Sequence, residues 1–242
     1  AATDGGGSIA LADVDGDLTV ESLTAQGNIT LGNSDTGTLT LAGNGDSTDE
    51  IAVINGKARF EIYGSGTVAL TGSNIVINDD IRTEGGNIDF TTTTGAITSA
   101  ADADIVTSSL ASTGTTSGRV RLTAGNGMLV NNITTAGSDN LNGVGANAAD
   151  VFLTALDGAL SVGNIIASGG SAVVSSSADI PANRNGGNAG VIVIEAVGDG
   201  ADGDDIIFNG NLTTAGGSAV GTSDTGLGGY INIKTAVVLT GD

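Results

Sequence analysis

Residues 66–90, GTVALTGSNIVINDDIRTEGGNIDF, contain one complete copy of the pattern that runs through this chain. A short run of alternating apolar and small polar residues begins at Val68, a second lies around Ile77, and a third begins at Ile81. The first run then returns at Ile88, 20 residues after Val68. A period of two with many β-branched residues, bounded by Gly, Asn and Asp, is typical of β-strands. The segment therefore predicts three short strands in a unit of about 20 residues.

The first run recurs along the whole chain, each time after a glycine. Its copies are Gly7–Leu11, Gly27–Leu31, Gly37–Leu41, Gly66–Leu70, Gly86–Phe90, Gly118–Leu122, Gly190–Ile194 and Gly229–Ile233. The second run recurs at Leu18, Ile77, Ile97, Leu129 and Leu160, and the third recurs at Leu23, Ile81, Ile105, Ile133 and Ile165. Early copies of the first run stand 20 residues apart, whereas later steps span 31 to 41 residues. Three short strands repeated at this spacing indicate the triangular coils of a parallel β-solenoid.

Energetics favour stacked coils over isolated strands. A strand of three residues buries one or two apolar side chains, worth about 1.5–3 kcal/mol each, while ordering its coil costs about 1–2 kcal/mol per residue. Stacking at about 4.8 Å lets backbone groups pair above and below and lines the interior with Ile, Leu and Val. We therefore predict an all-β fold in which residues 1–242 form a single solenoid domain of about eight coils. A β-barrel or an immunoglobulin-like sandwich is the alternative, although those folds favour longer strands and hairpin turns.

Three segments that lengthen the later coils are expected to be surface loops inserted at a corner. These glycine-rich and serine-rich segments are Ser138–Ala149, Ser171–Gly190 and Ser218–Gly228. Residues 42–65 fit the repeat least well, and Phe60 and Ile62 are candidates for an extra strand there. Residues 235–242 still resemble a strand, so we expect the chain to be a piece of a much longer protein.

The composition argues against several classes of function. The chain has 7 Lys and Arg against 27 Asp and Glu, for a net charge of −20, and it contains no Cys, His or Trp. These absences exclude thiol chemistry, disulfides, imidazole catalysis and most zinc sites, and so argue against an enzyme. Seven basic residues are too few for a phosphate-binding face, so we expect no nucleic-acid partner. The sequence has no long apolar run, so we expect no membrane insertion.

Two acidic segments are candidates for calcium sites. Asp13, Asp15 and Asp17 stand at alternate positions as in calcium-binding loops, although Thr24 occupies the place where an EF-hand needs a glutamate. A glycine-rich segment similar to one turn of a calcium-binding β-roll contains Asp199, Asp202, Asp204 and Asp205. A solvated acidic corner or loop is the alternative for each segment. We expect no cofactor, with calcium at these seven residues as the alternative.

A carbohydrate-processing β-helix enzyme is the sharpest alternative function. Such enzymes need paired carboxylates, and Asp79–Asp80 and Asp204–Asp205 are adjacent pairs. Neighbouring residues of a strand point to opposite faces, however, and aromatic residues for sugar stacking make up only 2% of the chain. Arg119 and Arg121 are predicted to face outward on a solvated surface.

Other outward positions give further expectations about the surface. The centres of the first runs form no regular threonine column, which argues against an ice-binding face; they are Ala10, Thr30, Thr40, Ala69, Asp89, Arg121, Phe152, Val193 and Asn232. Phe152, Val193 and Ile166 are predicted to be apolar and outward, and we expect the flanking insertions to cover them.

Three phrases of the repeat are similar to a known family. Gly27–Leu31 (GNITL), Asp15–Val20 (DGDLTV) and Asn132–Gly137 (NITTAG) resemble the coils of filamentous-haemagglutinin-like exoproteins and related giant bacterial surface adhesins. The resemblance extends over nearly the whole chain and is weakest in residues 42–65. It implies a right-handed parallel β-helix that forms a shaft on the bacterial outer cell surface or in a secreted, extracellular protein.

The resemblance also implies what this shaft does. We expect a structural and adhesive function without catalysis, in which loops contact a protein or glycan of a host or neighbouring-cell surface. Exposed strand edges at both ends of the stack predict end-to-end self-association. A calcium-stabilised binding module is the remaining alternative.

Overall fold

The computed structural model describes most of the chain, and all regular elements in the described part are β-strands. The described residues are 7–12, 16–20, 23–25, 27–32, 37–42, 52–54, 57–59, 62–64, 66–109, 112–141, 143–174, 184–198 and 205–235. In this part of the chain, no helix is long and apolar enough to cross a membrane.

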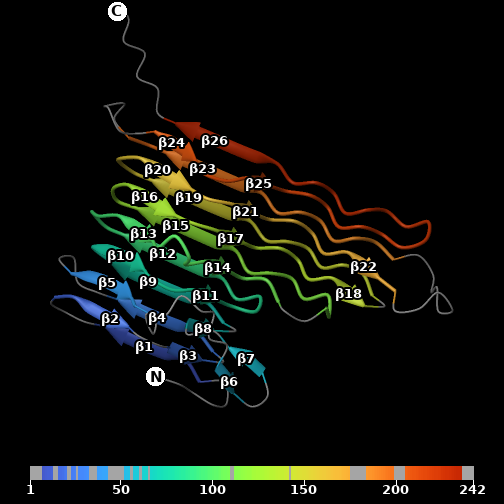
Figure 1. The fold of residues 1–242 in the computed structure, drawn as a ribbon, viewed down its shortest axis with the longest axis horizontal. Coiled ribbons are helices and arrows are strands. Elements are labelled where there is room, and N and C mark those ends of the chain that lie inside the picture. Colours follow the sequence, from blue (N-terminus) through green and yellow to red (C-terminus); the bar gives the residue numbers. More distant parts are fainter. Residues whose placement is uncertain are drawn as a thin grey trace, which may run out of the picture.

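Three long sheets run along the molecule (Figure 1). Sheet 1 contains, in order, β1 (Ile9–Ala12), β4 (Ile29–Gly32), β9 (Val68–Gly72), β12 (Ile88–Thr92), β15 (Val120–Ala124), β19 (Val151–Ala155), β23 (Ile192–Ala196) and β26 (Ile231–Thr235). Sheet 2 contains β2 (Leu18–Val20), β5 (Thr38–Leu41), β10 (Asn74–Ile77), β13 (Ile97–Ser99), β16 (Met128–Val130), β20 (Leu160–Val162) and β24 (Ile206–Phe208). Sheet 3 contains β3 (Leu23–Ala25), β8 (Ile62–Gly64), β11 (Ile81–Arg82), β14 (Ile105–Val106), β17 (Ile133–Thr134), β21 (Ile165–Ile166) and β25 (Leu212–Thr213).

The chain visits the three sheets in the same order in every coil. In the third coil, β9 lies in sheet 1, β10 in sheet 2 and β11 in sheet 3, and β12 then returns to sheet 1. Neighbouring strands of these sheets are parallel, so that Ile88 pairs with Val68 on one side and with Val120 on the other. Within the described residues, seven coils contribute to all three sheets and β26 begins an eighth. The predicted parallel β-solenoid is therefore confirmed. Its seven strand spacings from β1 to β26, at about 4.8 Å each, give a stack about 34 Å tall.

The inward side chains form continuous aliphatic columns. One column of sheet 1 consists of Ile29, Val68, Ile88, Val120, Val151 and Ile192, all with no exposed surface. The column of sheet 3 contains Ile81, Ile105, Ile133 and Ile165, which are at most 1% exposed. Both columns match positions predicted from the repeat, because only one side of each short strand can avoid water.

Buried threonines close the corner between sheets 3 and 1. Each stands two residues after an inward isoleucine of sheet 3, and each is fully buried; they are Thr83, Thr107 and Thr135. Their hydroxyls donate at 2.5–2.7 Å to backbone carbonyls of the chain that returns to sheet 1, those of Gly86, Gly118 and Ala149. The hydroxyl thus satisfies a backbone acceptor at a bend that water cannot reach.

The register of the early coils differs from the prediction in two places. The run Gly37–Leu41 lies in β5 of sheet 2 and is not a copy of the first strand. Ile62 is no extra strand residue, since β8 is the regular third strand of the second coil. Between β5 and β8, β6 (Ala52–Ile54) and β7 (Lys57–Arg59) form a local antiparallel pair, and Phe60 lies outside the described residues.

One second-strand position also shifts by a residue. Met128 occupies the inward column of sheet 2, where it pairs with Ile97 and Leu160. The predicted residue, Leu129, is 49% exposed. All three residues of β16 are apolar, so the sequence does not show which of them point inward.

The three insertions, predicted as surface loops at a corner, lie at the corner between sheets 3 and 1, where their described residues stack on one another. They leave sheet 3, run outward and return to sheet 1 as stacked segments; we call residues 137–141, 143–149, 169–174, 184–190 and 216–229 the wing. Figure 1 shows the wing extending the later coils to one side. Strands β18 (Asn140–Leu141) and β22 (Ala172–Val173) pair in parallel within it.

Glycine makes the wing possible because outgoing and returning segments pack backbone against backbone. The N–H groups of Gly170, Gly187 and Gly217 donate across the wing to the carbonyls of Ala146, Gly170 and Gly187, respectively, each at 2.8 Å. A Cβ on Gly187 would overlap the carbonyl oxygen of Ala146. Similar overlaps with a backbone oxygen apply to Gly137, Gly145, Gly169, Gly170, Gly186, Gly216, Gly217 and Gly226. The high glycine content is thus a packing requirement of the wing.

We expect Gly187→Ala to lower the free energy of unfolding by about 1–3 kcal/mol, because the added methyl group must displace the Ala146 carbonyl. Gly228→Ala is the matched control, since its Cβ would meet the Thr214 carbonyl oxygen at an ordinary 3.5 Å. This control is expected to change stability by no more than about 0.5 kcal/mol. Urea denaturation followed by circular dichroism measures both variants, and equal losses would contradict the packing described for the wing.

Candidate functional site

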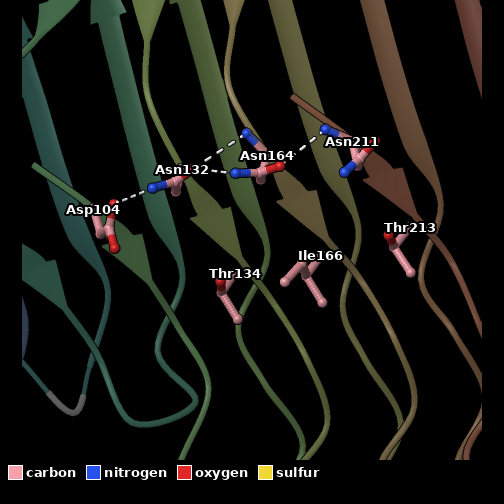
Figure 2. A pocket seen from close by; sticks show the side chains of 7 residues that line it. All are labelled: Asp104, Asn132, Thr134, Asn164, Ile166, Asn211 and Thr213. Carbon is pink, nitrogen blue, oxygen red and sulfur yellow. Dashed lines mark hydrogen bonds between the residues drawn. The ribbon is translucent and has the colours of Figure 1, made fainter. Parts of the chain in front are cut away.

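A ladder of amide and carboxylate side chains runs across the start of the sheet 3 strands. Its members Asp104, Asn132, Asn164 and Asn211 each precede the inward residue of a strand and are drawn in Figure 2. The Asn132 Nδ2 donates to Asp104 Oδ1 at 2.8 Å, and the Asn164 Nδ2 donates to Asn132 Oδ1 at 2.9 Å. The backbone N–H of Asn211 donates to Asn164 Oδ1 at 2.9 Å. In-register stacking brings like side chains together once per coil, as in other asparagine ladders.

These bonds have a common direction. In the ladder, the backbone N–H of the later coil donates to the side chain of the earlier coil. The same direction holds at other corners. The backbone N–H groups of Thr38, Thr67 and Asn188 donate to side-chain oxygens of the earlier coil, which belong to Asp17, Asn28 and Asn147, respectively. The bond from the Thr115 N–H to the Ser138 hydroxyl runs the opposite way.

The adjacent carboxylates Asp79 and Asp80 extend the ladder toward the amino terminus. Asp80 Oδ1 accepts the backbone N–H of Asp104 at 2.7 Å, and Asp79 Oδ1 accepts the N–H of Asp80 at 2.7 Å. Each of these carboxylates therefore holds a backbone donor at a corner of the stack. Asp204, from the other adjacent pair, lies outside the described residues.

A groove lies between the ladder and a second row of side chains. Asp104, Asn132, Asn164 and Asn211 form one side, Thr134, Ile166 and Thr213 form the other, and the groove has a volume of about 380 Å³. Figure 2 shows both rows following successive coils. Neither the Thr134 nor the Thr213 hydroxyl has a hydrogen-bond partner in the described part of the chain. We call this feature the ladder groove.

The two calcium candidates that the structure describes are far apart. Asp17 precedes β2 and Asp205 precedes β24, the two outermost strands of sheet 2, so six strand spacings, or about 29 Å, separate them. Asp17 Oδ1 accepts the Thr38 N–H at 2.8 Å, and Asp205 is exposed. The other candidates, Asp13, Asp15, Asp199, Asp202 and Asp204, lie outside the described residues. No cluster of three or more acidic side chains that could hold a metal ion occurs among the residues that are described.

The basic residues of β15 and its flank lie on the outer face of sheet 1 and have close partners. The Arg119 Nη2 forms an ion pair with Asp89 Oδ1 at 2.9 Å. The Arg121 guanidinium stacks over Phe152, 5.5 Å from the ring centroid. Phe152 and Val193 are half-buried, but Ile166 is 39% exposed, so the expected cover by the insertions is wrong for Ile166. The described parts of the insertions extend sideways as the wing and do not fold over sheet 3.

Two features of the surface were missed by the sequence reasoning. The outer face of sheet 1 carries an in-register column of Thr71, Thr91, Thr123 and Thr154, two residues beyond the centre of each run. This column lies beyond the run centres, on which the prediction about a threonine face was based. The ladder is the second feature, and the sequence does contain a pattern that predicts it. Asn132, Asn164 and Asn211 each directly precede the aliphatic residue that begins the third strand of a coil.

We expect Asp17→Asn to keep the wild-type melting temperature, because the amide oxygen can still accept the Thr38 N–H. Asp17→Ala removes this acceptor, worth about 1 kcal/mol, and is expected to lower the melting temperature by about 2–4 °C. Scanning calorimetry with calcium and with a chelator should give the same values for both variants. A calcium-dependent stabilisation that Asp17→Asn abolishes would instead assign a metal site to this corner.

Comparisons with protein-family models, with curated proteins and with solved structures give no match to this chain. The resemblance to filamentous-haemagglutinin-like proteins therefore stays a prediction from the coil phrases.

Proposed function

We propose that this chain is a structural and adhesive shaft segment of a large bacterial protein that is displayed on the outer cell surface or secreted. The observation that carries the proposal is the in-register stacking of the coils. Each coil pairs with the coil before it and the coil after it, as Ile88 does with Val68 and Val120. Such a fold lengthens by about 4.8 Å for every coil added, which suits a spacer that holds binding regions away from a cell.

The charge supports an extracellular shaft. A net charge of −20 keeps neighbouring shafts soluble and mutually repelling.

The carboxyl-terminal edge of the stack supports association along the axis. Ile231 and Ile233 continue the inward columns of sheet 1 but are 40% and 48% exposed, whereas Ile192 and Ile194 one coil earlier are fully buried. A further coil, from the same chain or from a second copy, would bury these side chains and add a strand beyond β26, the last strand of sheet 1 in the described part of the chain. This edge is where we propose end-to-end self-association.

The wing supports adhesion at the side of the shaft. It extends away from the aliphatic core and exposes apolar side chains, with Leu141 49%, Val144 56% and Leu227 73% exposed. Side chains of this kind on a projecting edge can contact a protein or a glycan of a host or neighbouring cell without disturbing the stack.

We expect deletion of residues 68–87, one whole coil, to leave a cooperatively folding protein. The deletion removes β9, β10 and β11 and brings Ile29 opposite Ile88, so every column stays in register. Deletion of residues 68–77 is the matched control, because it removes half a coil and places strands of different sheets side by side. Circular dichroism and thermal unfolding compare the two variants. Equal disruption by both deletions would contradict the modular shaft.

Antibodies raised against the purified chain test its location in the source organism. We expect them to label intact cells or to detect the protein in the culture medium, because a shaft acts outside the cell. An antibody against a cytoplasmic protein is the control. It should label lysed cells but not intact ones, which shows that the intact cells are sealed. Signal that requires lysis would contradict the proposed function.

A further inference from the structure

We propose that the ladder groove binds an extended, neutral, β-1,4-linked polysaccharide that lies along the stack. This inference rests on the proposed adhesive function and names the class of ligand for one face of the shaft. The groove spans the coils of β14, β17, β21 and β25, so its floor repeats once per coil.

The ladder side of the groove offers repeated polar groups. One hydrogen of the Asn132 Nδ2 is used by Asp104 Oδ1, and one hydrogen of the Asn164 Nδ2 is used by Asn132 Oδ1. An amide nitrogen carries two hydrogens, so each of these asparagines retains a donor for a ligand. The internal bonds fix the amides in place, and a ligand therefore meets donors that are already ordered.

The opposite side alternates polar and apolar groups. Thr134 and Thr213 carry hydroxyls without a partner in the described part of the chain, and Ile166 stands between them with 39% of its surface exposed. A sugar presents both hydroxyls and C–H faces, so this alternation suits a carbohydrate better than a purely polar or a purely apolar ligand.

Charge and spacing narrow the ligand class. Of the seven described residues that line the groove, only Asp104 is ionisable, and it is acidic. Together with the net charge of −20, this disfavours nucleic acids and sulfated or carboxylated glycans. An extended peptide advances about 3.4 Å per residue and falls out of step with coils about 4.8 Å apart. One sugar of an extended β-1,4-linked chain spans about one coil and is turned over relative to its neighbours, so the ligand repeats every second coil, as the row Thr134, Ile166 and Thr213 does.

Affinity electrophoresis in native gels that contain hydroxyethylcellulose tests the proposal. The wild-type chain should be retarded, and free cellotetraose should reverse the retardation. The double variant Thr134→Val/Thr213→Val removes both unpartnered hydroxyls, and we expect binding to weaken about fivefold for each hydroxyl lost. Thr123→Val is the matched control, because Thr123 stands in the threonine column on the outer face of sheet 1. This control should bind like the wild type.

Each other outcome overturns the proposal. One such outcome is no retardation by hydroxyethylcellulose, and another is that Thr123→Val weakens binding as much as the double variant does. A third is that soluble starch retards the chain as much as hydroxyethylcellulose does, because coiled α-linked chains cannot follow a straight groove. Retardation by gelatin alone would assign the groove to an extended polypeptide. None of these results affects coil deletion or cell labelling, so failure of the groove can be told apart from failure of the shaft.

Discussion

Parallel pairing of each coil with its two neighbours is the interaction on which the rest of the molecule depends. The strands of sheet 3 contain as few as two residues, as in β17 and β21, and such strands have no stability of their own. Stacking gives them hydrogen-bond partners on both sides and buries Ile133 and Ile165 completely. Side-chain ladders and buried corner threonines then fix the position of each bend. The columns, the ladder groove and the exposed end of the stack all follow from this one arrangement.

The wing obeys the same constraint with different chemistry. In the triangular part, aliphatic side chains fill the space between three sheets, whereas in the wing two backbone layers meet directly. The carbonyl of Gly170 in an outgoing segment lies where a side chain on Gly145 in a returning segment would stand, so the two layers can approach only where side chains are missing. One chain thus uses isoleucine to separate its layers in one region and glycine to bring them together in another.

The parts of the fold that could be predicted are those with strict recurrence. Val68, Ile88 and Val120 occupy predicted positions because each follows a glycine and alternates with polar residues. The run Gly37–Leu41 has the same pattern but lies in sheet 2, since alternation marks a strand without naming its sheet. The wing gave no apolar signal, because its contacts are made by backbone atoms. The ladder groove was not predicted for another reason: of its asparagines, the repeat phrases include only Asn132, and a phrase does not show which side chains become neighbours in space. Of the seven acidic candidates, the structure describes Asp17 and Asp205, which it places at opposite edges of one sheet.

The direction of the corner hydrogen bonds has a consequence for how the molecule is built. At Asp17, Asn28, Asn147 and Asn164, the acceptor belongs to the earlier coil and the N–H donor to the later one. These oxygen atoms stand at fixed places on the side of each coil that meets the next coil, and the backbone bond from Thr115 to Ser138 runs the other way. Each coil therefore presents side-chain acceptors to the coil that follows it and backbone donors to the coil that precedes it, which makes the stack polar along its axis.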